Sequence, residues 1–504
     1  MKTLTKLAVQ SWQWLHVGAN QLLVLLLVLA AFPLFWDLGR NPVQLWDESR
    51  QAVNAAELVR GGNWLVTTFA GQPDHWNTKP SLLIWLQASL IKLLGYGPWA
   101  LRLPSAVAAL GTVGLLYGFA ARTLRRPVAG FFGGLVLVTT AGYVRLHGTR
   151  TGDYDALLAF WELVSWLAFF QYLEGGRARY LYWVAAGFTL AVLTKGVAGL
   201  LGGPALLLYA LGRGKLGWLL RQPRLYGLVA LSLGVVATYY LAREAADPGY
   251  LAAVRANELD GRYGQALDGH SAPWTHYVDI LYIREFESWL WWLLPAVLVW
   301  WQPDRRVRRA GSLLLLVVLS WLVLISAAAT KLDWYALPIY PPLALLLGLG
   351  LDFLYQDVLA ANLPRLPRSM AWPLRVGLVV GLFYFPYRAV VRRLREEHDF
   401  SATADDRLAR YLGQVVAERP RLDSLTLLYG GGYNAVLQYY QTALRQTDHK
   451  IIAVRSRAEL RGLRPGAVVL VCDPQLRPSL DSIFQVAMLH QAAPCETLRV
   501  LALK

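Results

Sequence analysis

Charged residues are scarce in this chain. Asp, Glu, Lys and Arg together make up 16% of its 504 residues, whereas soluble domains typically carry about 25%. Hydrophobic residues make up 56%, and many of them form long runs with few charges. This composition excludes an ordinary soluble domain and predicts a protein with several membrane-spanning helices.

Acidic residues are the rarer of the two charge types. There are 33 of them against 49 Lys and Arg residues, which gives a formal net charge of +16. A strongly basic chain can indicate nucleic-acid binding, but here the basic residues are spread over short segments between apolar runs. We therefore attribute the charge balance to membrane orientation and expect no nucleic-acid partner.

Cysteine is almost absent. The two cysteines, Cys472 and Cys495, both lie in the last part of the chain. Each falls near the end of an expected strand, so a disulfide formed in an oxidising compartment and two unpaired thiols both remain open.

Apolar runs of membrane-spanning length recur along most of the chain. Windows of roughly 17 to 25 apolar residues are typical of transmembrane helices. Such runs cover residues 18–36, 100–121, 127–145, 155–173, 180–194, 197–212, 225–242, 288–302, 310–329, 335–355 and 371–387. No small-residue cleavage site follows the first run, which we expect to be a retained helix. The predicted fold class is an all-α polytopic membrane protein with about 11–13 transmembrane helices.

The basic residues cluster in alternate loops between these runs. The clusters lie at residues 122–126, 177–179, 213–224, 305–309 and 365–368. The positive-inside rule places them in the cytoplasm, which puts residues 37–99, 146–154, the junction near 195, 243–287, 330–334 and the C-terminal region on the opposite side. One basic cluster, residues 388–395, disagrees with this orientation.

Two regions outside the spans have their own predicted structure. The long external loop 37–99 contains helical patterns at 50–60 and 81–94, the second too short to span a membrane, so both are expected at the membrane surface. From residue 388 onward, short β-type runs at 425–429, 451–454 and 467–471 alternate with helical stretches. We predict a transmembrane module over 1–387 and a small external α/β domain over 388–504.

Charged residues at the predicted external boundaries are the candidate functional groups. The acids are Asp47, Glu48, Asp153 and Asp155, and the bases are Arg50, Lys79, Lys195 and Lys331. The simplest interpretations are solvated helix starts for the acids, a helix N-cap for Asp153, and lysines that reach toward the membrane surface. Their gathering on one predicted face favours instead a phosphate-bearing ligand held in a cleft between helices.

The order of short motifs carries a resemblance. DESR, NTKPSLLIWLQA, RLPSA, RTGDYDALLAFW, LTKG and KLDWYALPIYPPLALLLG follow one another over about residues 15–355. This order resembles the C-type (GT-C) glycosyltransferases of the dolichyl-phosphate-mannose protein mannosyltransferase superfamily, and within it the bacterial aminoarabinose (lipid A) transferase branch. The resemblance implies an integral-membrane enzyme that moves a sugar from a polyprenyl-phosphate carrier to a lipid, glycolipid or protein acceptor outside the cytoplasm.

The resemblance also implies roles for single residues. The family's first-loop acid falls on Asp47, with Glu48 beside it, and its phosphate-contacting arginine and lysine fall on Arg50 and Lys79. The second acid falls on Asp155, with Asp153 as the competing position. Less specific matches near the same cavity are Lys195, Lys331 and Tyr335. The chain departs from the branch at Gln51, where an aromatic residue is common, and at Thr78, where a Glu is common.

These residue types predict an inverting displacement. Arg50 and Lys79 would stabilise the leaving phosphate, Asp47 would act as general base on an acceptor hydroxyl, and Asp155 would orient the substrates. A divalent cation held by Glu48 and His75 is a weaker expectation, because one histidine and one acid do not make a metal site. Two alternative functions are a protein O-mannosyltransferase and a non-enzymatic glycolipid transporter or flippase.

Overall fold

The computed structural model divides into two compact units. It describes residues 18–266, 269–359, 368–399, 407–413, 424–428, 433–444, 450–454, 457–473, 475–492 and 495–504. Unit 1 comprises Met1–Trp36, Thr78–Leu83 and Pro104–Arg395, and unit 2 comprises Asp37–Asn77, Ile84–Leu103 and Glu396–Lys504. This grouping differs from a division at residue 387: the external loop is grouped with the C-terminal region, and helix α18 (Arg368–Asp399) runs through the expected boundary.

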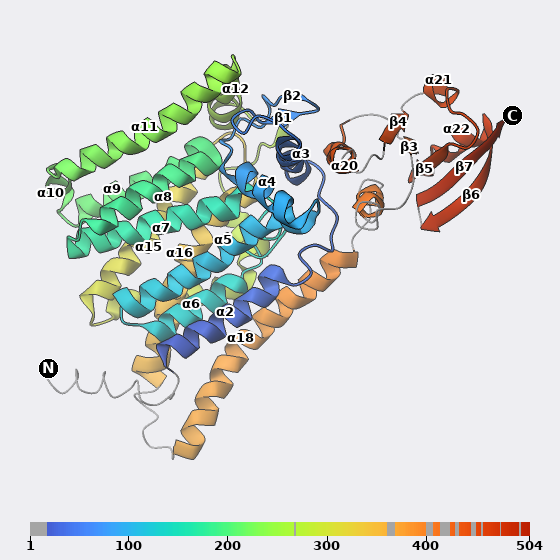
Figure 1. The fold of residues 1–504 in the computed structure, drawn as a ribbon. Coiled ribbons are helices and arrows are strands. Elements are labelled where there is room, and N and C mark those ends of the chain that lie inside the picture. The colour runs from blue at the N-terminus through green and yellow to red at the C-terminus, as the bar shows by residue number, and fades with distance from the viewer. Residues whose placement is uncertain are drawn as a thin grey trace. The chain divides into compact units, whose positions relative to one another are not determined.

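Unit 1 is a bundle of apolar helices that run side by side (Figure 1). The longer helices are α2 (Ala19–Phe35), α5 (Pro98–Gly118), α6 (Pro127–Val138), α7 (Tyr154–Gly175), α8 (Arg179–Lys195), α9 (Gly203–Gly212), α11 (Pro223–Ala246), α15 (Arg305–Ala327), α16 (Tyr340–Phe353) and α18. Shorter helical segments are η2 (Phe119–Thr123), η3 (Gly196–Leu200), α10 (Leu216–Leu220), α12 (Tyr250–Val254), η4 (Arg255–Gly264), α13 (His276–Ile280), η6 (Leu281–Glu285), η7 (Glu287–Trp292), α14 (Leu293–Ala296), η8 (Val297–Trp301), η9 (Asp333–Ile339) and η10 (Leu354–Leu359).

Several of these helices are long and apolar enough to cross a membrane. Within the described part of the chain there are seven, at Pro98–Thr123, Tyr154–Gly175, Arg179–Leu200, Pro223–Ala246, Arg305–Ala327, Asp333–Gln356 and Pro373–Glu396. Shorter apolar helices are Ala19–Phe35, Leu82–Leu94, Pro127–Val138 and Gly203–Gly212. The predicted polytopic membrane fold is confirmed, and the chain is an integral membrane protein.

Two predicted spans differ from the structure in extent. The run 127–145 is helical only as far as Val138. The Thr139 hydroxyl donates to the Leu135 carbonyl in addition to Thr139 N, whereas at Thr140 the hydroxyl donates to the Val136 carbonyl and the backbone N donates to Leu137 instead. The run 288–302 is three short segments, η7, α14 and η8, rather than one regular helix.

Two glycines allow helices α6 and α16 to approach each other closely at the centre of the bundle. A Cβ added at Gly348 of α16 would lie 2.4 Å from the carbonyl oxygen of Ala129 in α6. One added at Gly133 would lie 3.2 Å from the carbonyl oxygen of Ala344. The backbones of α6 and α16 are therefore in direct contact, an approach that small residues permit between membrane helices.

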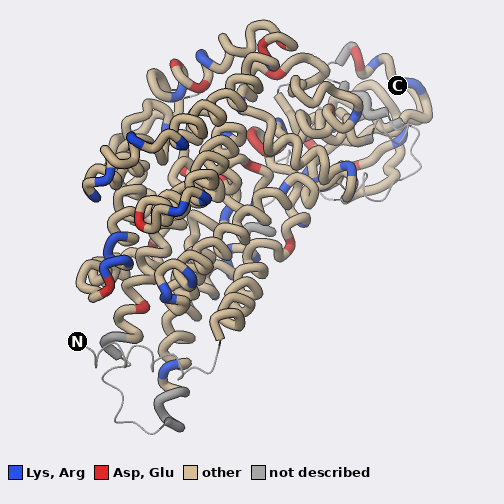
Figure 2. Tube along the Cα trace, turned by 60° about the vertical axis from the view of Figure 1, so that its left-hand side comes forward, with Lys and Arg blue, Asp and Glu red and all other residues tan. Residues whose placement is uncertain are grey.

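Charged residues are sparse along the helices (Figure 2). At one end of the bundle, Glu174 accepts hydrogen bonds from Arg213 Nε (2.9 Å) and Arg309 Nη1 (2.6 Å). Glu174 lies in the last turn of α7, just before the loop at 177–179, so basic residues of two other predicted basic loops approach this loop.

Unit 2 contains the helices predicted in the external loop and a mixed sheet. The helices are α3 (Asp47–Val59) and α4 (Leu82–Leu94), whose first two residues belong to unit 1, and a small hairpin pairs β1 (Thr68–Phe69) with β2 (Gln72–Pro73). The sheet has the order β4-β3-β5-β7-β6, with strands β3 (Ser424–Leu428), β4 (Lys450–Val454), β5 (Val468–Val471), β6 (Phe484–Ala492) and β7 (Cys495–Leu503). Helices α20 (Ala435–Leu444), α21 (Arg457–Leu460) and α22 (Arg477–Asp481) complete this α/β region.

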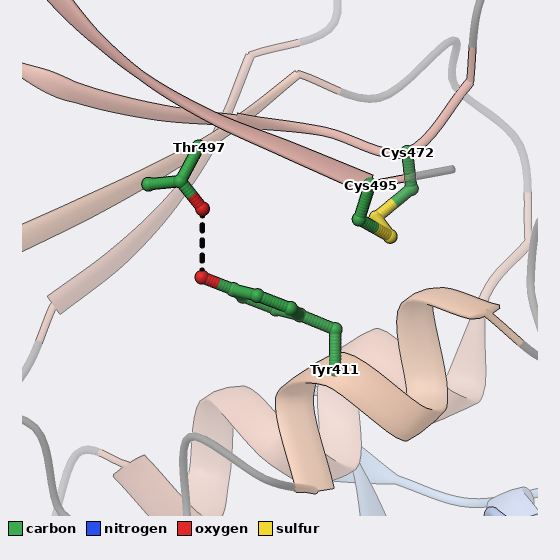
Figure 3. The surroundings of a disulfide bond; sticks show 4 residues. All are labelled: Tyr411, Cys472, Cys495 and Thr497. Carbon is green, nitrogen blue, oxygen red and sulfur yellow. Dashed lines mark hydrogen bonds between the residues drawn. A yellow bond between two sulfur atoms is a disulfide. The ribbon is translucent and has the colours of Figure 1, made fainter. Parts of the chain in front are cut away.

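The sheet is mixed: the three strands predicted from the sequence are parallel, and the two that were not predicted are antiparallel. Strands β4, β3 and β5 are parallel and match the predicted runs, whereas β7 and β6 add an antiparallel pair. Cys472, directly after β5, and Cys495, the first residue of β7, form a disulfide between these neighbouring strands (Figure 3). The open question of their pairing is therefore answered in favour of the bond.

Candidate active site

A cavity in unit 1 gathers most of the predicted functional residues. Its charged and polar lining comes from the segment before α4, the first turn of α7, the end of α8, and segments η4 and η9. The lining residues are Lys79, Asp155, Leu158, Lys195, Val197, Ala198, Leu201, Glu258, Arg262, Tyr263, Trp321, Ile325, Ala328 and Tyr335. Four of them, Lys79, Asp155, Lys195 and Tyr335, were singled out from the sequence.

Asp155 and Lys195 form a buried ion pair at the wall of the cavity. Lys195 Nζ lies 2.5 Å from Asp155 Oδ1, and both residues are buried. The two residues suit their positions, since an acid in the first turn of α7 and a base in the last turn of α8 both interact favourably with the helix dipole. Lys195 Nζ also lies 5.0 Å from the ring centroid of Tyr335.

Glu258 is a central acid that sequence reasoning missed. Its Oε1 accepts a hydrogen bond from Thr78 Oγ1 (3.1 Å) and lies 3.4 Å from Lys79 Nζ, while its Oε2 lies 3.6 Å from Arg262 Nε. Burial alone would raise the pKa of Glu258, but Lys79, Arg262 and Thr78 outweigh it, so the pKa is lowered and the carboxylate stays charged. Its sequence signal is the Glu258–Arg262 spacing in an otherwise polar segment.

Arg262 completes the cationic side of the cavity. Its guanidinium donates to the hydroxyl of Tyr335, so η4 and η9 are joined at this point. Together with Lys79 and Lys195 it gives the cavity three cations against the two carboxylates of Asp155 and Glu258.

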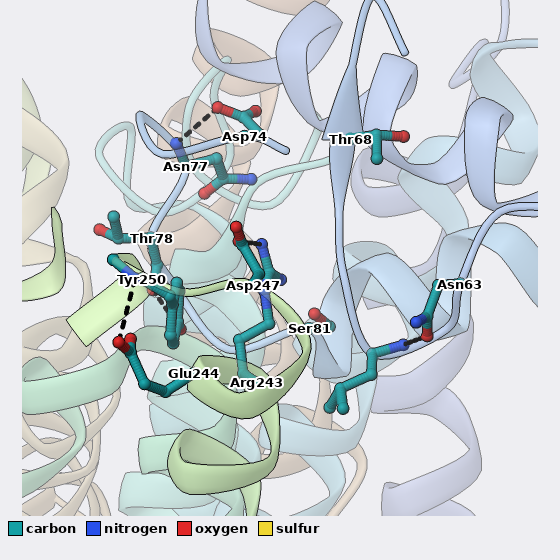
Figure 4. Close-up of polar contacts among 12 residues, drawn as sticks. Asn63, Thr68, Asp74, Asn77, Thr78, Ser81, Arg243, Glu244, Asp247 and Tyr250 are labelled. Carbon is teal, nitrogen blue, oxygen red and sulfur yellow. Dashed lines mark hydrogen bonds and ion pairs between the residues drawn. The ribbon is translucent and has the colours of Figure 1, made fainter. Parts of the chain in front are cut away.

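A layer of polar contacts holds the segment that carries Lys79. Tyr250 Oη donates to the carbonyl oxygen of Thr78 (2.7 Å), and Ser81 N donates to Tyr239 Oη (3.1 Å). Arg243 lies over the Tyr250 ring, 4.6 Å from its centroid, and pairs with Asp247 (Figure 4). The backbone on both sides of Lys79 is thereby fixed against α11 and α12.

Asp153 and Lys331 take other positions in unit 1. Asp153 is buried at the N-terminus of α7 and accepts a hydrogen bond from Thr151 Oγ1, and it does not line the cavity. Lys331 Nζ donates to the carbonyl oxygen of Ala328 (2.7 Å) rather than facing the cavity. The geometry favours Asp155 as the second acid.

Glu48, in unit 2, belongs to a buried ion pair. Arg102 donates from Nε to Oε1 (2.6 Å) and from Nη2 to Oε2 (2.8 Å), and Gln44 N also donates to Oε2 (2.8 Å). Glu48 and Arg102 are 0% and 1% exposed. Because both oxygens are occupied by a cation, Glu48 does not fit the divalent ion that was considered for it with His75, which is an exposed loop residue.

Arg50 is held in place by a neighbouring acid. Asp74 accepts from its Nε (3.0 Å) and its Nη2 (2.7 Å), and the Phe69 ring centroid lies 4.5 Å from the guanidinium carbon. Burial opposes both charges, but the paired hydrogen bonds outweigh it, so the pKa of Asp74 is lowered and that of Arg50 is raised. Asp47 is exposed in the first turn of α3.

Comparison with known families agrees with this arrangement. Residues 78–241 match the model of the dolichyl-phosphate-mannose-protein mannosyltransferase family. The matched segment contains Lys79, Asp155 and Lys195, three of the charged residues of the cavity.

Curated relatives are aminoarabinose transferases. Undecaprenyl phosphate-alpha-4-amino-4-deoxy-L-arabinose arabinosyl transferase 1 of Pseudomonas fluorescens is 31% identical over 371 residues, which is 71% of this chain and 63% of that protein. Transferase 2 of the same organism is 30% identical over 342 residues, 64% of this chain and 55% of the relative. The chain thus aligns with less than two thirds of the length of these relatives.

Solved structures share the fold over nearly the whole chain. ArnT from Cupriavidus metallidurans bound to undecaprenyl phosphate gives a TM-score of 0.66 at 18% identity and covers 95% of this chain and 98% of that one. The apo oligosaccharyltransferase of Archaeoglobus fulgidus gives 0.55 at 10% identity, with 93% and 73% covered. The fold is therefore the GT-C fold of ArnT, as the motifs predicted.

Proposed function

We propose that the protein is a glycosyltransferase that moves a sugar from a polyprenyl-phosphate carrier to an acceptor, a lipid or glycolipid. The observation that carries the proposal is the convergence of Lys79, Lys195 and Arg262 with Asp155 in one cavity. Cations held by buried carboxylates suit a phosphate group whose negative charge grows as it leaves. The relatives named for undecaprenyl-phosphate-linked donors support the carrier class.

The cavity residues would act mainly through charge. Lys79 supplies a compact point charge and Arg262 a planar guanidinium, and both are already oriented by Glu258 before a ligand arrives. Removing one such preorganised contact typically lowers kcat by about 10²–10³. Glu258 acts here as a positioning residue because its contacts are to the cations.

The proposed reaction is a single displacement. An acceptor hydroxyl oxygen forms a bond to the anomeric carbon while the bond from that carbon to the carrier phosphate oxygen breaks. The electron pair leaves with the phosphate, and the hydroxyl proton passes to a carboxylate that acts as general base, a role that the family resemblance gives to Asp47. Asp155 orients the substrates, and the configuration at the anomeric carbon is inverted.

We further propose that the cavity end of the bundle faces the extracytoplasmic side of the bacterial inner membrane, together with the C-terminal α/β region. The support is that basic residues of two predicted basic loops approach Glu174, just before a third, at one end, and the positive-inside rule assigns that end to the cytoplasm. The polyprenyl-linked sugar would then be transferred on the side of the membrane opposite the cytoplasm, where nucleotides are found.

Sugar transfer by the purified full chain tests the proposal. The assay supplies a panel of undecaprenyl-phosphate sugars with lipid A and with a peptide mixture, and compares wild type with Lys79→Ala and Asp47→Asn. Donor-dependent transfer that both variants lose, in protein that still folds and binds lipid, is the expected result. If no donor is consumed while glycolipid crosses vesicle membranes, the chain is a transporter instead.

A further inference from the structure

Unit 2 carries an exposed stack of aromatic rings beside Asp47. The rings of Trp46 and Tyr433 are stacked with centroids 5.3 Å apart and an interplanar angle of 18°. Tyr433 stacks in turn with Phe69, at 5.9 Å and 15°. Trp46 is 65% exposed and Tyr433 is 38% exposed, so burial of their rings within the fold does not account for the stack.

The backbone of Trp46 is strained. Its φ of 78° and ψ of −113° lie outside the regions that L-residues normally occupy, and mainly glycine adopts such values readily. The position is nevertheless occupied by the largest side chain, and that side chain is largely exposed. Strain of this kind concentrates at ligand-binding sites, where it holds a side chain in place for a partner.

Arg50 fixes the stack from its protein side. Its guanidinium carbon lies 4.5 Å from the Phe69 centroid and 5.9 Å from those of Tyr433 and Trp76. Because the bidentate bond to Asp74 locks the guanidinium, the rings rest on an immobile plane. A rigid aromatic surface loses little conformational entropy when a ligand binds to it.

The chemistry of this surface fits a sugar ring. Its exposed ring faces can cover the apolar C–H face of a pyranose, as amphipathic Trp and Tyr side chains do at wet interfaces. The exposed carboxylate of Asp47, which directly follows Trp46, can accept a hydrogen bond from a hydroxyl at the edge of the sugar.

We propose that Trp46 and Tyr433 form a stacking platform for a pyranose ring of the acceptor, which sets a sugar hydroxyl against Asp47. The stacking itself is independent of the reaction. The role of Asp47 as proton acceptor rests on the proposed function.

Saccharide binding by the full chain in lipid nanodiscs tests the platform without any donor. The probe is a soluble glucosamine disaccharide, observed by saturation-transfer NMR. Saturation is expected to reach its ring C–H protons in wild type, and Trp46→Gly is expected to weaken binding by about tenfold or more, as for a central interfacial Trp. Glycine accepts the observed φ, so this variant keeps the local backbone.

Matched variants show whether the aromatic rings themselves bind the sugar. Tyr433→Phe keeps the ring and should bind like wild type, Tyr433→Ala should not, and Lys79→Ala should retain disaccharide binding. Equal binding by wild type and Trp46→Gly, or no saturation in wild type, overturns the proposal.

The platform and the proposed function fail in different ways. If disaccharide binding depends on Trp46 but no sugar is ever transferred, the transferase proposal fails and the platform stands. If transfer occurs with an acceptor KM that is unchanged in Trp46→Gly, the platform is refuted and the transferase proposal stands.

Discussion

The buried Glu258 forms an ion pair with the partly buried Lys79, with Oε1 of Glu258 lying 3.4 Å from Nζ of Lys79 and 3.1 Å from Oγ1 of Thr78. The chain has Thr78 where the aminoarabinose branch commonly has a glutamate directly before this lysine. The carboxylate is thus supplied from η4 instead of from the neighbouring residue. The charge next to Lys79 is kept although its position in the sequence has changed.

This relationship predicts the effect of Glu258→Gln. The amide keeps the shape but removes the charge that orients Lys79 and Arg262, and misplacing a catalytic group by about 1 Å can lower the rate by about 10²-fold. We expect kcat to fall by that order with little change in acceptor KM. Steady-state transfer kinetics with varied donor and acceptor measure both.

A charge swap provides the control for Glu258. Thr78→Glu combined with Glu258→Thr returns the carboxylate to the position that the branch commonly uses, and should recover much of the activity that Glu258→Thr alone loses. Thr78→Glu alone places two carboxylates together and should be harmful. If the double variant is as inactive as Glu258→Thr, the carboxylate has a role other than orienting Lys79.

For the Asp155–Lys195 pair, we expect a double variant that regains thermal stability but not transfer activity. Removing one member of a buried pair leaves an uncompensated charge and typically destabilises by about 3–5 kcal/mol. Lys195→Met should therefore lower the thermal stability strongly, and Asp155→Asn with Lys195→Met should restore most of it. Transfer should stay lost in the double variant. Full activity in a stable double variant would exclude both residues from the reaction.

The membrane-spanning helices were predictable because each one is encoded by a single continuous apolar run. A run of apolar residues such as 155–173 needs no knowledge of its neighbours to be identified as a helix, and α7 covers it. The ends were less predictable, as at Thr140, where the side-chain hydroxyl donates to the Val136 carbonyl that would accept from the backbone N–H in a continuing helix. Strands β6 and β7 were not identified from the sequence, although each contains an apolar run of four residues.

The sequence motifs predicted which charged residues are candidates for the site, but not which partner each of them contacts. Glu258 lies 180 positions from Thr78, in a segment with no apolar pattern, and only the folded bundle brings the two together. Glu48 stands beside Asp47 in sequence, yet Arg102, 54 positions away, takes both of its oxygens. Residue type and spacing identify which groups are costly to bury, whereas the tertiary fold decides which partner each one meets.

The Arg50–Asp74 pair predicts acid sensitivity in unit 2. The pKa of Asp74 is lowered in the folded protein, so its stabilising effect is present above the unfolded value of about 3.9 and is lost as the pH falls through the folded value. Asp74→Asn should destabilise the protein at neutral pH by about 1.5–3 kcal/mol, the range for hydrogen bonds to charged groups. Thermal unfolding of both proteins from neutral pH down to about pH 3 measures this, with wild type losing its advantage below about pH 4. Parallel pH profiles would contradict this role of the pair.

The Cys472–Cys495 disulfide predicts a local effect on the sheet. It closes a loop with a sequence separation of 23 and joins β5 to β7, so its loss should destabilise this region by about 2–4 kcal/mol. Hydrogen exchange of the β5 and β7 amides should accelerate in Cys472→Ser with Cys495→Ser, while amides of α7 and α16 should exchange as before. Reductant should accelerate the exchange of the same amides in wild type and should not change their exchange in the double variant. If reductant leaves exchange in wild type unchanged, the bond does not stabilise the sheet, and the hydrogen bond between Tyr411 and Thr497 of β7 becomes the contact to test next.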